Sequence, residues 1–321
     1  MQAVVQRRYG SPDVLEPTEL GKPAPREDEV LVRVHAASIN EWDWGRLHGT
    51  PLVNRALFGL FRPRRKHRIL GCDISGRVES VGSEVGTLRP GDEVFGDLSG
   101  SGWGGFAEYV CAREAVLAIK SPRMSFEEAA AVPQAGLLAL QGLRKGRIKP
   151  GQQVLINGAG GGVGTFAIPL AKSMDTEVTG VDSAEKFEVM RTVGADHVVD
   201  YKEDDFTRTG LTYDLILEVM GRRSLSDYRR ALKPNGTCIL VGGSTSVILR
   251  AVALGSFGTQ KIQLLLHKPD VNDLRRMNEL YEKGAYAPII DRSYDLPELA
   301  EAFRYYESGH HKGKLVVRIV R

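Results

Sequence analysis

A glycine-rich segment in the middle of the chain has the spacing of a dinucleotide-binding loop. A short apolar run, residues 154–157, leads into Gly158, Ala159, Gly160, Gly161, Gly162, Val163 and Gly164. Glycines let backbone N–H groups approach a pyrophosphate, and the helix that follows adds unpaired amides and the positive end of its dipole. The segment matches AxGxxG, a variant of the GxGxxG fingerprint. It therefore predicts a pyrophosphate site.

Two further features fit a dinucleotide site. Asp182 lies about 20 residues beyond the loop, the spacing at which an acid meets the adenosine ribose. Its carboxylate suits the free diol of NAD and would repel a 2′-phosphate. Further along, an expected strand over 237–241 ends in Gly242 and Gly243. We include these two glycines among the expected cofactor-binding residues.

The elements around the loop alternate between helix and strand. We expect helices over 163–174, 184–193 and 224–232, and strands over 177–182, 197–201, 214–220 and 237–241. Short apolar strands that alternate with longer helices are typical of a parallel sheet covered on both faces. The sequence thus predicts an α/β fold with a Rossmann-type, doubly wound sheet.

The flanking regions have a different texture. Residues 29–36 alternate between apolar and polar with period two, and glycine and proline punctuate the first 120 or so residues, which favours antiparallel β-structure. Ser125 and Glu128 have the spacing of a capping box. After these come expected helices over 137–143, 272–283 and 296–308, a strand-like run after Val241, and a last strand over 314–319. We expect a first β-rich part over 1–122, the nucleotide-binding domain over 123–262, and a return to the first domain over 263–321.

Composition restricts the function classes. The 43 basic and 40 acidic residues give a net charge of +3, too small to favour a nucleic-acid partner. Cys72, Cys111 and Cys238 are widely separated, which indicates a reducing compartment without disulfides. The N-terminal residues lack the apolar core of a signal peptide. We expect a soluble cytoplasmic protein with no membrane partner, in which the basic run 62–68 is a solvated loop or gathers an anion.

The order and spacing of several short motifs resemble the medium-chain dehydrogenase/reductase superfamily, in particular its zinc-free quinone oxidoreductase branch, which includes zeta-crystallin. The motifs are residues 37–43, 70–78, 81–82, 90–94, 105–109, 130–133, the glycine loop, 194–196 and 313–314. The resemblance covers nearly the whole chain. It implies a GroES-like catalytic domain, a Rossmann domain, and hydride transfer with NAD(P)H in the cleft between them.

Zinc alcohol dehydrogenases of the same superfamily hold a catalytic zinc through thiolates and an imidazole. Here Asn40 stands at the first cysteine position and Cys72 at the histidine position, with Asp73 in place of the following glutamate. The third ligand is expected near Pro133 and Gln134, where there is no cysteine or histidine. The four-cysteine structural lobe is also missing. We therefore expect no metal.

Without a metal to stabilise an alkoxide, hydride transfer to an already electron-poor acceptor is favoured over oxidation of a plain alcohol. We expect a quinone or an activated alkene or carbonyl as substrate. Asn40 is the candidate catalytic hydrogen-bond donor, with a strand-ending turn asparagine as the other interpretation. Trp42, Trp44 and Cys72 are candidate pocket residues, and ordinary packing is the alternative for each.

The resemblance also bears on cofactor choice. Ser183 and Lys186 occupy positions where NADPH-binding quinone reductases offer a hydroxyl and a cation to the 2′-phosphate, and Tyr201 matches their aromatic residue near the adenine. An arginine that some relatives carry near the C-terminus is replaced by Gly309. We favour NADP(H) over NAD(H), provided that Asp182 turns away from the phosphate.

The resemblance further implies a homodimer acting on a small molecule. Two alternative functions stay open from the sequence. One is an alcohol or aldehyde dehydrogenase of the same superfamily. The other is a catalytically silent, crystallin-like protein that binds a nucleotide or RNA, against which the near-neutral charge argues.

Overall fold

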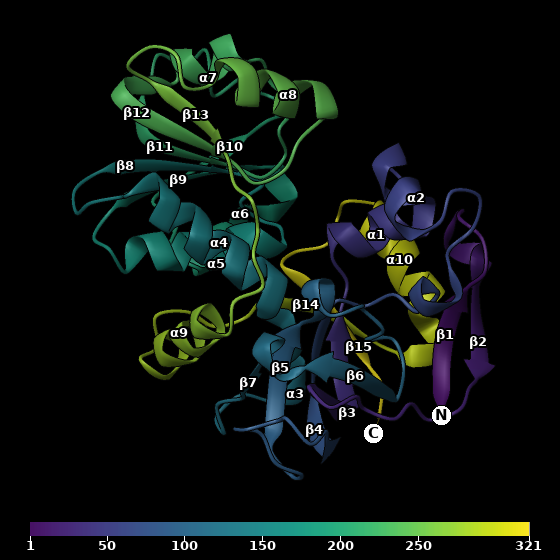
Figure 1. Cartoon of the computed structure of the whole chain (residues 1–321). Coiled ribbons are helices and arrows are strands. Elements are labelled where there is room, and N and C mark those ends of the chain that lie inside the picture. The colour runs from purple at the N-terminus through teal and green to yellow at the C-terminus, as the bar shows by residue number, and fades with distance from the viewer. Residues whose placement is uncertain (321) are drawn as a thin grey trace. The chain divides into compact units, whose positions relative to one another are not determined.

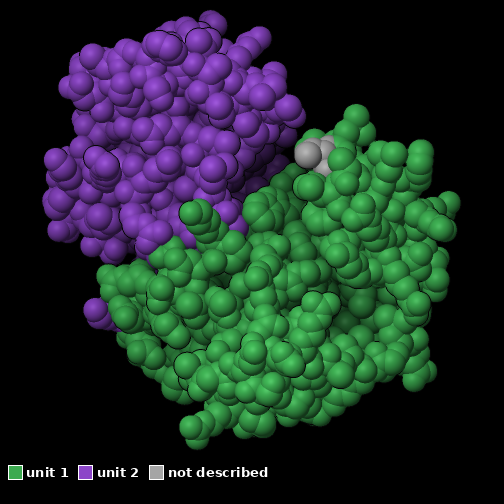
Figure 2. Space-filling model, in the orientation of Figure 1, with its two compact units in different colours: residues 1–134, 268–282, 290–321 green, residues 135–267, 283–289 purple. Residues whose placement is uncertain are grey.

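The computed structural model describes residues 1–320, with the backbone alone at Val53, and it divides into two compact units (Figure 1, Figure 2). Unit 1 comprises Met1–Gln134, Lys268–Glu282 and Ile290–Arg321, and unit 2 comprises Ala135–His267 and Lys283–Ile289. The domain limits expected from the sequence, at 122 and 262, stay a prediction. No helix within residues 1–320 is long and apolar enough to cross a membrane.

Unit 1 is built on a seven-stranded sheet in the order β14-β15-β3-β4-β5-β7, with β6 pairing β3. The strands are β3 (Glu29–Ser38), β4 (Asp73–Val81), β5 (Glu93–Asp97), β6 (Tyr109–Arg113), β7 (Leu117–Ile119), β14 (Ile290–Asp295) and β15 (Lys314–Arg318). All pairs are antiparallel except β14 with β15. A separate hairpin pairs β1 (Gln2–Gln6) with β2 (Leu15–Glu19). The antiparallel β-structure predicted for the first 120 or so residues is confirmed.

The helices of unit 1 are α1 (Glu41–His48), α2 (Leu52–Phe58), α3 (Phe126–Ala131), α9 (Val271–Glu282) and α10 (Leu299–Glu307). The expected capping box is present at α3, where Ser125 Oγ accepts from the Glu128 amide and the Glu128 carboxylate accepts from the Ser125 amide. Phe106 and Phe303 of α10 meet edge to face, with ring centroids 6.0 Å apart. Their contact joins the C-terminal helix to the β-rich core.

Unit 2 holds a six-stranded parallel sheet in the order β10-β9-β8-β11-β12-β13. Its strands are β8 (Gln153–Asn157), β9 (Glu177–Asp182), β10 (His197–Asp200), β11 (Tyr213–Glu218), β12 (Leu232–Leu240) and β13 (Lys261–Leu264). In chain order this is 3-2-1-4-5-6, the doubly wound arrangement whose switch point lies between the first and fourth strands. The predicted Rossmann fold is confirmed.

Helices cover both faces of this sheet (Figure 1). They are α4 (Pro133–Gly146), α5 (Gly162–Lys172), α6 (Phe187–Thr192), α7 (Leu225–Arg230) and α8 (Thr245–Leu254). A strand-like run was expected after Val241, but the next element is helix α8, and strand β13 comes only after it. The Ser244 cap of α8 accepts a hydrogen bond from the Val247 amide. That cap was the local signal available for the helix.

Candidate active site and cofactor loop

A cluster of buried polar side chains lies in unit 1, where several strands begin or end. Asp73 at the start of β4 pairs in register with Ser38 at the end of β3 and with Asp97 at the end of β5. Lys314 begins β15, which also pairs with β3. The other members are Asn40, Cys72 and Gln134. The sheet therefore brings together residues that are far apart in the sequence.

Asn40 is held by three polar contacts inside this cluster. Its side-chain N–H groups donate to Asp73 Oδ2 at 3.0 Å and to Cys72 Sγ at 3.4 Å, while its Oδ1 accepts from the Lys314 ammonium. An amide nitrogen carries two hydrogens, so both are engaged. The amide consequently has one fixed orientation.

Gln134 lies where the sequence placed the missing third metal ligand. Its backbone N–H donates to both carboxylate oxygens of Asp73, at 3.2 and 3.1 Å. Its side-chain amide donates to Cys72 Sγ at 3.7 Å. The structure thus brings the three expected ligand positions together beside Asp73, but they hold two amides and one thiol.

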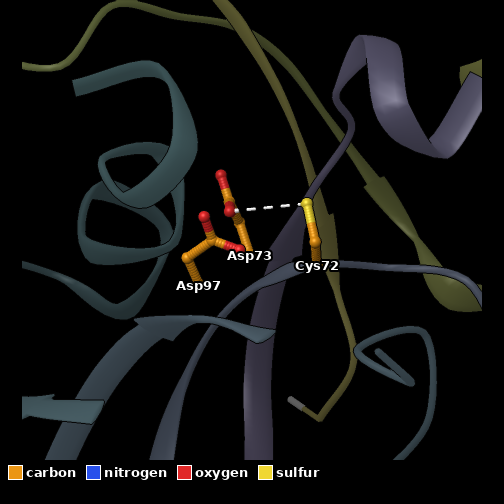
Figure 3. Close-up of side chains that lie close together, drawn as sticks. All are labelled: Cys72, Asp73 and Asp97. Atoms are coloured by element: carbon orange, nitrogen blue, oxygen red, sulfur yellow. Dashed lines mark hydrogen bonds between the residues drawn. The ribbon is translucent and has the colours of Figure 1, made fainter. Parts of the chain in front are cut away.

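Cys72, Asp73 and Asp97 point toward one another, and their ligand atoms lie within 4.8 Å (Figure 3). Lys314 lies beside them, because its Nζ is 3.8 Å from Asp73 Oδ2 and donates to the Ile39 carbonyl at 3.2 Å. Burial lowers the pKa of Lys314, and the neighbouring Asp73 acts to raise it. The Asn40 amide hydrogens occupy the same sulfur and oxygen atoms that a metal would need. With one thiol and no imidazole, this donor set does not fit zinc.

Burial dominates the electrostatics of the cluster. It raises the pKa of Asp73 to about 7, although Lys314 acts to lower that value. It raises the pKa of Asp43 to about 6 against the hydrogen bonds from the Gly71 and Asn40 amides. The pKa of the Cys72 thiol is raised by burial and by nearby carboxylates, so the thiol is neutral at neutral pH. Cys72 is therefore not an activated nucleophile.

Sequence reasoning missed the roles of Asp43, Asp97 and Lys314. The Asp43 carboxylate accepts from the backbone N–H of Gly71 at 2.8 Å and from the backbone N–H of Asn40 at 3.0 Å. These two hydrogen bonds fix the start of α1. The spacing of Asp43, three residues after Asn40, was a usable capping signal. In the sequence, Lys314 was identified only as part of the motif at residues 313–314, because no local pattern predicts which buried acid a distant lysine contacts.

The two tryptophans expected in the substrate pocket lie on α1. Trp42 is 40% exposed. Trp44 donates through its indole N–H to Glu307 at 3.0 Å, and its ring centroid is 4.7 Å from that of His48. His48 contacts the same glutamate at 2.6 Å. Trp44 is thus tied to α10, and the substrate roles of both tryptophans stay predictions.

In unit 2, the glycine loop joins β8 to α5 as predicted. Gly164 must be glycine, because a Cβ there would lie 2.3 Å from the Ala159 carbonyl oxygen. Gly158 has a φ of +87°, a conformation that favours glycine. The first amides of α5, at Gly162, Val163 and Gly164, have no acceptor within their own helix. This cradle fits a pyrophosphate.

Asp182, at the end of β9, is engaged by the loop itself. Its Oδ2 accepts from the Gly160 amide at 3.0 Å, and its Oδ1 accepts from the Ser183 amide at 2.9 Å. Lys186 Nζ lies 3.6 Å from the same Oδ1, with both side chains nearly buried. The carboxylate is thus partly neutralised from within the unit. Tyr201, in contrast, is 51% exposed.

The switch point of the sheet carries a buried acid that the sequence analysis missed. The Asn157 amide, at the end of β8, donates to both oxygens of Glu218 at 2.8 and 2.9 Å. Glu218 also accepts from the amides of Met220 and Gly221. A Cβ on Gly243 would lie 3.0 Å from the Gly221 Cα, so the loop at 242–243 closely approaches the loop after β11.

Comparisons with known proteins agree with this architecture. Residues 26–123 match the model of the alcohol dehydrogenase GroES-like domain, and residues 193–317 match that of a zinc-binding dehydrogenase. The chain is 30% identical over 329 residues to the chloroplastic quinone-oxidoreductase QR1 of Triphysaria versicolor, covering 99% of this chain and 98% of the relative. It is 31% identical to the chloroplastic NADPH-dependent alkenal/one oxidoreductase of Arabidopsis thaliana, covering 99% of this chain and 79% of the relative. Among solved structures, the quinone oxidoreductase from Coxiella burnetii has a TM-score of 0.91 at 31% identity, covering 100% of this chain and 99% of that one.

Proposed function

The chain belongs to the medium-chain dehydrogenase/reductase superfamily, in its quinone oxidoreductase branch, and on that premise we propose that it is an NAD(P)H-dependent oxidoreductase that transfers a hydride to a quinone or to an activated alkene or carbonyl. The observation that carries this proposal is that one chain holds both a dinucleotide cradle, in unit 2, and a buried polar cluster, in unit 1, whose donor atoms do not fit zinc. The cradle would bind the cofactor, and the polar cluster would act without a Lewis acid for an alkoxide.

The residues that would hold the cofactor are those of the loop and its neighbours. They are Gly158, Ala159, Gly161, Gly162, Val163, Gly164, Asp182, Ser183, Lys186, Tyr201, Gly242 and Gly243. A bound reduced nicotinamide supplies the hydride. The loop amides and the start of α5 would bind the pyrophosphate and orient the rest of the molecule.

For cofactor choice we propose NADP(H). Asp182 accepts two backbone N–H groups and pairs with Lys186, so less of its charge is left to repel a 2′-phosphate. A relative named as NADPH-dependent supports the same choice. The test compares kcat/KM for NADPH and NADH in the native protein and in Asp182→Gly. A native preference for NADH would overturn this part of the proposal.

We also propose that catalysis is independent of zinc. The Lys314 amine lies 3.8 Å from Asp73 and would repel a divalent cation when protonated, and the side-chain N–H groups of Asn40 contact the sulfur and oxygen that would bind one. Asn40 stays our candidate for the group that meets developing negative charge on the substrate, for which it would exchange its long N–H contact with Cys72 Sγ, at 3.4 Å, for one with the substrate. Lys314 polarises this amide at Oδ1, which strengthens its N–H groups as donors.

The direct test of the reaction is NADPH oxidation by purified protein against a panel of quinones, enones and simple aldehydes, with the reverse reaction on simple alcohols as comparison. The proposal expects turnover with the conjugated acceptors and little with the alcohols. Absence of NADPH binding in a fluorescence titration would overturn it, as would activity restricted to alcohols with added zinc.

Two finer properties complete the proposal. We propose a homodimer formed through unit 2, because β13 is an open sheet edge and the neighbouring α8 exposes Leu249 (64%) and Val252 (68%). Light scattering of the native protein and of Leu249→Ser checks the oligomeric state.

We propose a cytoplasmic location from the three free cysteines.

A further inference from the structure

The segment from residue 49 to residue 68, called here the α2 lobe, exposes large apolar side chains. Leu52 is 76% exposed, Leu57 59%, Leu60 61% and Phe61 86%. Single exposed apolar residues are ordinary, but four within ten residues form a patch of the kind that marks an interaction site. In Figure 1, α2 lies beyond α1, at the end of unit 1 away from β3 and β4.

The same lobe carries the densest positive charge of the chain. It contains six arginines and lysines and no acidic residue, whereas the whole chain has a net charge of only +3. Arg62, Arg64, Arg65 and Lys66 are exposed directly after Phe61. His67 adds no charge, because burial and the neighbouring cations lower its pKa to about 4. The exposed apolar and cationic residues therefore adjoin one another.

The inner side of the lobe is packed, so the outer side chains do not fold back onto it. The Arg46 guanidinium lies between the rings of Phe58 and Trp103, at 4.2 and 4.0 Å from their centroids. The Tyr9 hydroxyl donates to the Gly59 carbonyl at 2.6 Å. The segment is thus held in place on its inner side, while its apolar and cationic side chains are exposed.

We propose that the α2 lobe docks on the surface of an anionic lipid bilayer. Leu57, Leu60 and Phe61 would enter the boundary between headgroups and acyl chains, while the cations after them contact anionic headgroups. This mode lies on a membrane without spanning it, and it revises the expectation of no membrane partner. Nucleic acid would use the cations but leave the aliphatic side chains unused, so the observations favour a bilayer.

The test is flotation of the native protein with vesicles of phosphatidylcholine, alone or with a third of phosphatidylserine. Binding is expected with the anionic vesicles and to fall with added salt. Each lost cation weakens partitioning about fivefold, so Arg64→Gln/Arg65→Gln/Lys66→Gln should lower it about a hundredfold. Leu60→Ser/Phe61→Ser should lower it at least about tenfold.

Control variants remove the same number of cations, or one leucine as exposed as Leu60, elsewhere. Lys145→Gln/Lys149→Gln/Lys283→Gln removes three exposed cations from unit 2, and Leu211→Ser removes a side chain that is 61% exposed. Both should bind vesicles like the native protein, and all variants should keep its melting temperature. The assay needs no turnover, so its result is independent of the proposed reaction.

Three outcomes would overturn the proposal. One is equal binding, or none, to neutral and anionic vesicles. Another is vesicle binding unchanged in both lobe variants, with the apolar variant instead altering the oligomeric state. The third is binding to a single-stranded RNA probe that depends on the three cations but not on Leu60 and Phe61, without any vesicle binding.

Discussion

Replacing Lys314 with methionine tests how the buried cluster is stabilised. The lysine side chain is 3% exposed, its Nζ donates to Ile39 O at 3.2 Å and to Asn40 Oδ1, and it lies 3.8 Å from Asp73 Oδ2. Methionine has a similar length but no charge. Methionine leaves the Ile39 and Asn40 oxygens without this donor and Asp73 without its partner, which together cost about 3–5 kcal/mol. The free energy of unfolding should fall by about that amount at mildly alkaline pH.

The size of this loss should depend on pH in a defined direction. The folded-state pKa of Asp73 is about 7, above its unfolded value, and Lys314 acts to lower it. Without the ammonium it rises further. Between the two values the folded state binds more protons than the unfolded state, so the contribution of Asp73 to stability declines as pH rises. In the native protein this decline ends near pH 7, whereas in the variant it continues, so the defect should be constant below about pH 6 and grow between about pH 7 and pH 8, by at most about 1.4 kcal/mol.

Urea unfolding of both proteins between pH 5 and pH 8 measures the effect. Lys120→Met is the matched control, because Lys120 is also buried but pairs at 3.0 Å with the partly exposed Glu93. Glu93 stays ionised above about pH 6, so the control defect should be flat there. Asp73→Asn/Lys314→Met should recover most of the stability. A Lys314→Met defect of equal size at pH 5 and pH 8 would refute the reasoning.

Three further predictions follow from the loop and the thiols. Gly164→Ala should lower the free energy of unfolding of unit 2 by about 1–3 kcal/mol, because the new Cβ clashes with the loop backbone. The control Gly161→Ala, whose Cβ would meet nothing nearer than 3.6 Å, should change it by less than about 1 kcal/mol in the same denaturant unfolding. Equal effects of the two substitutions would contradict the packing. Lys186→Met should raise the Kd for NADPH at least about tenfold more than that for NADH, by fluorescence titration, and an equal loss for both would argue against a phosphate contact. Cys72 is fully buried and its pKa is raised, so it should resist iodoacetamide until the protein unfolds. Cys111 is half-buried with a pKa raised to about 11, so it should react slowly at alkaline pH. Peptide mass spectrometry measures the labelling of both, and a labelled Cys72 in native protein would contradict its burial.

The parts of the fold that the sequence predicted are those with strong local signals. The glycine loop, the strand that ends at Asp182 and the capping box at Ser125 are each specified by neighbouring residues, and each is present. Helix α8 was missed, because an apolar run of this length does not distinguish a buried strand from a helix.

The polar cluster could be predicted only in part. The sequence identified which metal ligands are absent at Asn40 and Cys72. It did not show that Lys314 would stand beside Asp73, since the contact depends on the pairing of β15 with β3 and of β3 with β4. Likewise, the engagement of Asp182 by the Gly160 amide depends on how closely the loop approaches β9. Long-range register, which no local pattern encodes, decides both.

The most direct test of the central claim is a single turnover of metal-depleted protein with NADPH that carries deuterium at the transferred C4 position, mixed with an enone or a quinone. Metal content is measured on the same sample. The account predicts full conversion without zinc, with deuterium at the β carbon of the reduced enone. An absence of deuterium in that product, or conversion only after zinc is restored, would contradict it.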